Sequence, residues 1–190
     1  MKDSDSNEYQ VTYTFQKQST STSSITELEG TWKSSCINTG SSKYRIKTIT
    51  VSGTNFTDQW KYHSDSNCTT DDYSYDTTYS SLSIGNAIIF DGGKTGHKLT
   101  MTVDTNTYTP LSSSDVTWNN NNSWCGETDW VLNTAQSIAG KTCGSSTEWN
   151  TNITIYGVYA LDGSKLYMGL ASGSYPSTVT TSDNASYTKQ

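Results

Sequence analysis

The chain has 190 residues, of which 32% are hydrophobic and 16% are charged, and its formal net charge is −6. With one arginine and an excess of acidic residues it has no basic stripe to neutralise phosphates, which excludes nucleic-acid binding. No apolar run approaches the roughly 18 residues that a membrane-spanning helix needs. Aliphatic residues are few, so the 13 tyrosines and 6 tryptophans must supply much of the buried surface.

Residues 1–24 are predicted to form a polar tether ahead of a folded domain at 25–190. The first eight residues are small, polar and acidic, and they lack the apolar region of a signal peptide. They resemble the tether that follows the lipidated cysteine of bacterial lipoproteins. Residues 9–15 alternate apolar and polar side chains, which indicates one extra strand. We expect an exported protein, periplasmic, anchored to the outer membrane or extracellular, and a lipid anchor on its precursor is one option.

The domain itself reads as many short strands separated by turn residues, with almost no helix. Its strongest hairpin signal is Asp162-Gly163, which suits a type I′ turn. Residues 108–123 and 136–148 are predicted to be loops. This pattern indicates an all-β fold, an antiparallel up-and-down β-barrel of about eight strands, with a β-sandwich as the alternative. The strands expected in chain order are 30–33, 44–51, 54–63, 73–79, 87–90, 97–103, 124–134, 152–161, 164–170 and 186–189.

The four cysteines predict two disulfides. Their number is even, and they lack the paired C-x-x-C spacing of zinc sites. Of the three possible pairings we expect Cys36–Cys68 and Cys125–Cys143, because each closes one strand–loop–strand excursion. Disulfides are typical of exported proteins, and free buried thiols in a cytosolic barrel are the alternative.

No metal or cofactor is predicted. Residues 65–76 approximate the oxygen spacing of a calcium loop, but Thr70 occupies the position that requires glycine. We expect the chain to act as a monomer.

Leu28-Glu29-Gly30-Thr31-Trp32 resembles the Gly-x-Trp motif that opens the first barrel strand of the calycin superfamily, which includes lipocalins, fatty-acid-binding proteins and streptavidin-like barrels. Residues 175–190 look like the closing segment of bacterial lipocalin-like lipoproteins. The resemblance implies a barrel that binds small, mostly apolar ligands, with Trp32 buried at its closed end. In that family the tryptophan stacks against an arginine from a late strand, whereas the one arginine here, Arg45, lies early.

The candidate binding site lies on the strand 54–63, where Phe56, Asp58, Trp60 and Tyr62 share one face. If this face points inward, a desolvated carboxyl lies among aromatic rings, where it can anchor a ligand or exchange a proton. We expect Trp60 and a second tryptophan to sandwich a planar ligand in the barrel mouth, with a methionine that adapts to its shape. The predicted site residues are Phe56, Asp58, Trp60, Tyr62, Tyr73, Tyr75, Met101 and Trp130.

Three functions fit these residues. The first is binding of a small hydrophobic or aromatic molecule in the barrel mouth. The second is a surface carbohydrate-binding or adhesive β-sandwich with an exposed aromatic row. The third is a barrel enzyme that uses Asp58 as general acid or base. The aromatic residues could instead simply form the core. Two glycines, Gly157 and Gly169, are expected to mark bends or close approaches in the last hairpin.

Overall fold

Antiparallel strands dominate the computed structural model of the protein, as the sequence predicts. The structure describes residues 27–40, 42–89, 95–179 and 186–190, so the strand predicted at 9–15 lies outside the described residues. Among them, no helix is long and apolar enough to cross a membrane. The elements are β1 (Gly30–Lys33), β2 (Ile37–Gly40), β3 (Lys43–Ser52), β4 (Asn55–His63), β5 (Asp71–Ile89), β6 (Thr95–Pro110), α1 (Ser113–Asn121), the 3₁₀-helix η2 (Trp124–Gly126), β7 (Gln136–Ser137), β8 (Thr142–Cys143), β9 (Ser146–Thr147), β10 (Thr154–Asp162), β11 (Lys165–Ser172) and β12 (Ser186–Lys189).

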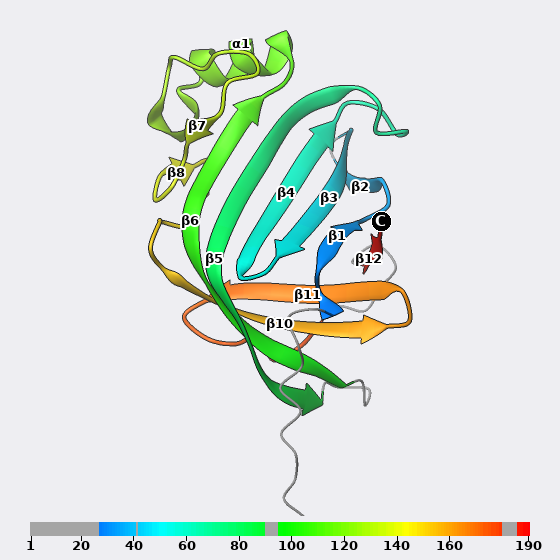
Figure 1. Cartoon of the computed structure of the whole chain (residues 1–190). Helices are drawn as coiled ribbons and strands as arrows, with labels where there is room; N and C mark the ends of the chain where they lie inside the picture. Colours follow the sequence, from blue (N-terminus) through cyan, green and yellow to red (C-terminus); the bar gives the residue numbers. More distant parts are fainter. Residues whose placement is uncertain (1–26, 41, 90–94, 180–185) are drawn as a thin grey trace, which may run out of the picture.

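Eight of these strands pair in a ring. In the order β1, β3, β4, β5, β6, β10, β11, β12, each strand is antiparallel to the next, and β12 pairs with β1. The ring therefore follows the chain order, with β2 added beside β3 and β7 beside the end of β6. In Figure 1, β10 and β11 cross β5 and β6 at a steep angle, while α1 lies beyond the end of β6 and β7 and β8 lie beside β6.

One part of the ring interior holds the largest cluster of buried hydrophobic side chains; we call it the packed end. Trp32 is 3% exposed there, and its indole nitrogen donates to the Leu28 carbonyl oxygen at 2.8 Å. The ammonium of Lys189 on β12 lies 5.4 Å from the centre of the Trp32 ring, because the two residues face each other across the β1–β12 pair. The buried side chains of the packed end are Leu28, Trp32, Ile49, Val51, Phe56, Tyr79, Leu82, Leu99, Met101, Val103, Ile155, Tyr159, Leu166 and Tyr187.

Residues 111–153 form an insertion between β6 and β10, and here two predictions are wrong. The expected loop at 108–123 contains the end of β6 and the helix α1, whose first turn is capped by the Ser112 hydroxyl accepting from the Asp115 amide at 3.1 Å. The expected strand at 124–134 is η2 followed by turns. Ser123 and Cys125 have φ of +49° and +54°, which an extended strand does not allow.

Both predicted disulfides are present. Cys36–Cys68 joins the segment before β2 to the loop between β4 and β5. Cys125–Cys143 joins η2 to β8 within the insertion. Each disulfide joins two cysteines that are neighbours in the order of cysteines along the chain, at separations of 32 and 18 residues.

Candidate functional site

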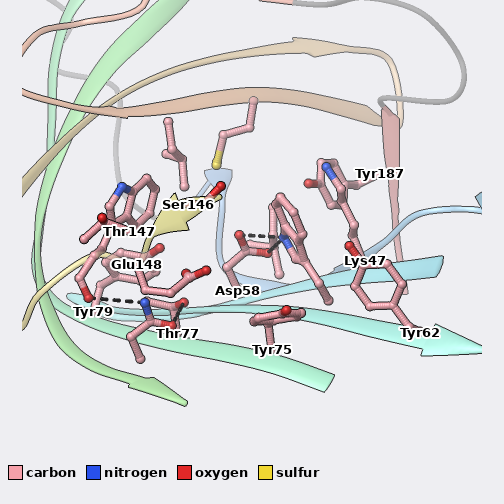
Figure 2. A pocket seen from close by; sticks show the side chains of 16 residues that line it. Lys47, Asp58, Tyr62, Tyr75, Thr77, Tyr79, Ser146, Thr147, Glu148 and Tyr187 are labelled. Atoms are coloured by element: carbon pink, nitrogen blue, oxygen red, sulfur yellow. Dashed lines mark hydrogen bonds between the residues drawn. The ribbon is translucent and has the colours of Figure 1, made fainter. Parts of the chain in front are cut away.

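The opposite part of the ring interior, beside the insertion, is hollow; we call it the hollow end. It contains a cavity of about 480 Å³ (Figure 2). Residues 146–149 of the insertion cover the cavity and are called the roof below. Its walls come from β3, β4, β5, β6, β11 and β12, and the residues that the argument uses are Lys47, Asp58, Trp60, Tyr62, Tyr75, Thr77, Tyr79, Asn106, Met168, Leu170 and Tyr187.

The inward-facing side chains of β4 extend from the packed end into the cavity wall. Phe56 lies in the core, and Asp58, Trp60 and Tyr62 follow on the same face along the cavity wall. The register places Trp60 between Lys47 on β3 and Tyr75 on β5, so all three side chains point into the cavity. Because the side-chain period of a strand is two, this inward face follows directly from the pairing register.

Among the described residues, the cavity wall contains one carboxyl group among its aromatic rings, that of Asp58. The Trp60 indole nitrogen donates to both of its carboxylate oxygens at 3.0 Å. Burial raises the pKa of Asp58 to about 6, although the Trp60 hydrogen bond and the nearby Lys47 and Arg45 charges each act to lower it. The carboxyl therefore exchanges its proton near neutral pH, and it keeps partial contact with the cavity.

Two cations hold the Trp60 ring. The Arg45 guanidinium lies 4.3 Å from the centre of the indole, and the Lys47 ammonium lies 4.4 Å from it. Arg45 also donates to the Tyr62 hydroxyl at 2.8 Å. Burial and the Arg45 charge lower the pKa of Lys47. Cation–π contacts of this kind contribute about 0.5–2 kcal/mol each, so Trp60 presents a fixed aromatic surface to the cavity.

The roof is attached to the ring by a buried amide. Asn106 on β6 donates to the Trp149 carbonyl oxygen at 3.2 Å and accepts from the Thr77 hydroxyl at 3.3 Å. The Trp149 ring lies 6.4 Å from the Tyr79 ring, centre to centre. Burial raises the pKa of the neighbouring Glu148 carboxyl, which also lines the cavity. The roof thus contributes one aromatic ring and one carboxyl.

The structure brings half of the predicted site residues together. Asp58, Trp60, Tyr62 and Tyr75 line the cavity. Phe56 and Met101 lie below it in the core, each 1% exposed. Tyr73 stacks between Tyr62 and Tyr108, at ring distances of 4.5 and 5.4 Å, and lines a neighbouring cavity.

Trp130 is placed elsewhere, so it does not face Trp60. It packs with Tyr108, Ile138 and the Cys125–Cys143 disulfide, and its indole nitrogen donates to the Trp124 carbonyl oxygen at 3.2 Å. The expected sandwich relied on a strand at 124–134 that the structure does not contain. Several lining residues are absent from the predicted site, among them Lys47, Glu148, Met168, Leu170 and Tyr187. Period-two spacing is a signal for three of these: Lys47 lies two residues from Ile49, and Met168 lies two residues from Leu170.

A second cavity of about 440 Å³ lies between the ends of β5 and β6 and the helix α1. The Lys43 ammonium pairs with the Asp72 carboxylate there. Tyr108 donates to Asp115 at 2.7 Å, and burial raises the pKa of that carboxyl. These polar groups bind one another, and the contact between Tyr108 and Asp115 attaches the insertion to the ring.

The segment that approximates a calcium loop has another role. The Asp65 carboxylate accepts from the backbone amides of Asn67, Thr69 and Thr70 at 2.6–3.3 Å, and these bonds lower its pKa to about 2. Among the described residues, no three His, Cys, Asp or Glu side chains gather in a way that would hold a metal ion.

No protein-family model and no curated protein matches the chain.

Proposed function

We propose that the chain is a calycin-like β-barrel that binds one small planar aromatic molecule in the 480 Å³ cavity. The cavity carries this proposal: its volume lies in the range of small-molecule sites, and aromatic side chains with a few polar groups form its walls. A ligand ring would lie against Trp60, whose orientation the contacts to Arg45, Lys47 and Asp58 fix before binding.

Three features support the calycin-like part of the proposal. The ring order follows the chain, as in an up-and-down barrel. Trp32 is buried in the packed end, away from the cavity. The Lys189 ammonium, on the last strand, lies 5.4 Å from the centre of the Trp32 ring, so a late strand supplies a cation to this tryptophan, although it is a lysine and not the arginine that the resemblance implies. The two disulfides also support the expectation of an exported protein.

The carbohydrate-binding or adhesive sandwich receives less support. Because β1 pairs with both β3 and β12, the two halves of the sheet form one ring rather than two separate layers. Among the aromatic residues that the structure describes, only Trp118 is largely exposed, at 52%. An adhesive aromatic row would need several such rings on one surface.

Acid–base catalysis by Asp58 is the second candidate function, and one observation favours it. The pKa of about 6 lets this carboxyl both donate and accept a proton at neutral pH. An Asp58→Asn variant that folds and binds a substrate but does not convert it would support this function.

Isothermal titration with two neutral planar probes, 2-naphthol and tryptophol, tests the binding proposal. We expect Trp60→Ala to weaken binding by about 1–3 kcal/mol, because a buried aromatic anchor is lost. Trp118→Ala is the matched control, since this tryptophan lies outside the 480 Å³ cavity. Circular dichroism confirms folding of both variants. Equal affinity of the wild type and Trp60→Ala would contradict the proposed site.

A further inference from the structure

Two carboxyl groups from different elements enter the same cavity. Asp58 comes from the wall on β4, and Glu148 comes from the roof; Figure 2 shows both among the lining side chains. Neither carboxyl forms an ion pair with any residue in the part of the chain that the structure describes. Buried carboxylates are normally paired with a cation. Both carboxyls instead enter the cavity without a direct ion-pair partner among the described residues.

The two carboxyls differ in their surroundings. Asp58 has the charges of Lys47 and Arg45 nearby and the Trp60 hydrogen bond. Glu148 has no such cation: the influences on it are burial and the Asn106 amide. Among the lining residues Lys47 can balance only one of the two carboxyls. Glu148 is accordingly the carboxyl that has no cation acting on it in the described part of the chain.

Aromatic rings surround the same region. Trp149 adjoins Glu148 in the roof and lies edge-to-face with Tyr79, and Tyr75 lines the same cavity. Aromatic faces attract ammonium groups, most strongly where water is excluded. A carboxylate without a cation, beside tryptophan and tyrosine rings, is an arrangement that recognises a protonated amine.

An anionic ligand fits less well. The Arg45 and Lys47 charges already lie over the Trp60 ring, and Arg45 donates to Tyr62. A ligand carboxylate near them would also face Asp58 and Glu148 in a confined space, and like charges that close repel strongly.

We propose that the ligand of this cavity is an aromatic amine, with its ring against Trp60 and its ammonium bound by Glu148. This inference rests on the proposed function, since it names the chemical class of the molecule bound at that site. Glu148 is the specificity-determining residue, and the roof supplies it. The aromatic wall alone would accept neutral and charged rings alike.

Three indoles that differ in one terminal group test the inference: tryptamine with an ammonium, tryptophol with a hydroxyl and indole-3-acetate with a carboxylate. By titration calorimetry at neutral pH we expect tryptamine to bind at least about tenfold more tightly than tryptophol, since a charged hydrogen bond is gained. Indole-3-acetate should bind most weakly. Glu148→Gln should remove the preference for tryptamine over tryptophol, because the amide carries no charge to pair with the ammonium.

Asp104→Asn is the matched control, because it removes the same unit of charge from an exposed carboxylate on β6 that accepts from Ser80. It should leave the tryptamine preference unchanged. If tryptophol binds wild-type protein as tightly as tryptamine, or if Glu148→Gln keeps the preference, the inference is wrong and the proposed function stands. If none of the three indoles binds, the proposed function fails as well.

Discussion

The packed end and the hollow end of the ring are built from the same strands but from different residue types. Along β3 the inward residues change from Val51 and Ile49 to Lys47, and along β4 they change from Phe56 to Asp58 and Trp60. The aliphatic side chains at the packed end are almost fully buried and pack against one another. The inward residues at the hollow end are rings with polar tips and charged groups, which are costly to bury fully. The packed end therefore coincides with aliphatic inward side chains, and the cavity coincides with aromatic and charged ones.

Mutual contacts keep the aromatic wall of the hollow end open. Tyr62 and Tyr73 stack at 4.5 Å, and Tyr75 meets Tyr108 edge-to-face at 5.0 Å. Each such pair adds about 0.5–1.5 kcal/mol beyond the burial of its area. The rings therefore support one another from strand to strand without filling the cavity, and the packed end provides the stability that the hollow end lacks.

The largest effect should follow from emptying the packed end. We expect Trp32→Ala to lower the free energy of unfolding by about 3–5 kcal/mol, because it removes a large buried ring together with the hydrogen bond to Leu28. Urea unfolding measures this loss, and the exposed Trp118→Ala is the reference. The tryptophol affinity should stay unchanged, since Trp32 does not line the cavity. A loss below about 1 kcal/mol would contradict the division between the two ends.

The last hairpin offers a finer test of packing. Gly157 pairs with Leu99 on β6 and Leu170 on β11, and a Cβ at position 157 would come within 2.5 Å of the Leu99 side chain and 2.8 Å of Leu170. We expect Gly157→Ala to cost about 1–3 kcal/mol through overpacking. Gly169→Ala is the matched control, because its Cβ would meet nothing closer than 3.6 Å. Equal stability of the two variants in urea unfolding would show that the core yields to the extra methyl group.

Most ring strands, the two disulfides and the shared face of Phe56, Asp58 and Trp60 on β4 could be predicted because they depend on local order in the sequence. Which face of β4 points inward could not be predicted, because it depends on the pairing with β3 and β5. Alternation with period two defines a strand and its faces together.

At Gly157 the structure shows a close approach of the Leu99 and Leu170 side chains. A close approach is one of the two interpretations of a glycine within a strand, and a corner-turning bend is the one preferred from the sequence. At Gly169 a Cβ would make only ordinary van der Waals contacts, so the structure shows no close approach there.

The insertion could not be predicted because its structure depends on polar contacts between distant residues. The helix α1 has no apolar face: Asn119 is its one buried residue, and it donates to Asp115 and Tyr108. Trp130 is held by the Asn120 side chain, which accepts from its amide at 2.7 Å and donates to its carbonyl oxygen at 3.0 Å. Such pairings leave no periodic signal, and for this reason the roof and Glu148 were missed.

The smallest expected effect concerns the cost of keeping the hollow end charged. Burial raises the pKa of Asp58 from 3.8 to about 6. Between those values the folded chain holds a proton that the unfolded chain has released, so the free energy of unfolding falls as pH rises from about 4 to about 6. Above that window the full cost of the ionised carboxyl is present. The whole shift corresponds to about 3 kcal/mol, and contact with water in the cavity reduces this to about 1–2 kcal/mol.

Asp58→Asn should therefore stabilise the chain by about 1–2 kcal/mol at pH 7.5 and leave its stability nearly unchanged at pH 4. The amide oxygen can still accept from Trp60, so the wall geometry should survive the substitution. Urea unfolding of both proteins across this pH range gives the measurement, and the difference between them cancels the other titrating groups, such as Asp115 and Glu148. If Asp58→Asn were instead less stable than wild type at pH 7.5, the attraction of Lys47 and Arg45 would outweigh the burial of the carboxylate. The attraction between the Asp58 carboxylate and these two cations would then add to the free energy of unfolding.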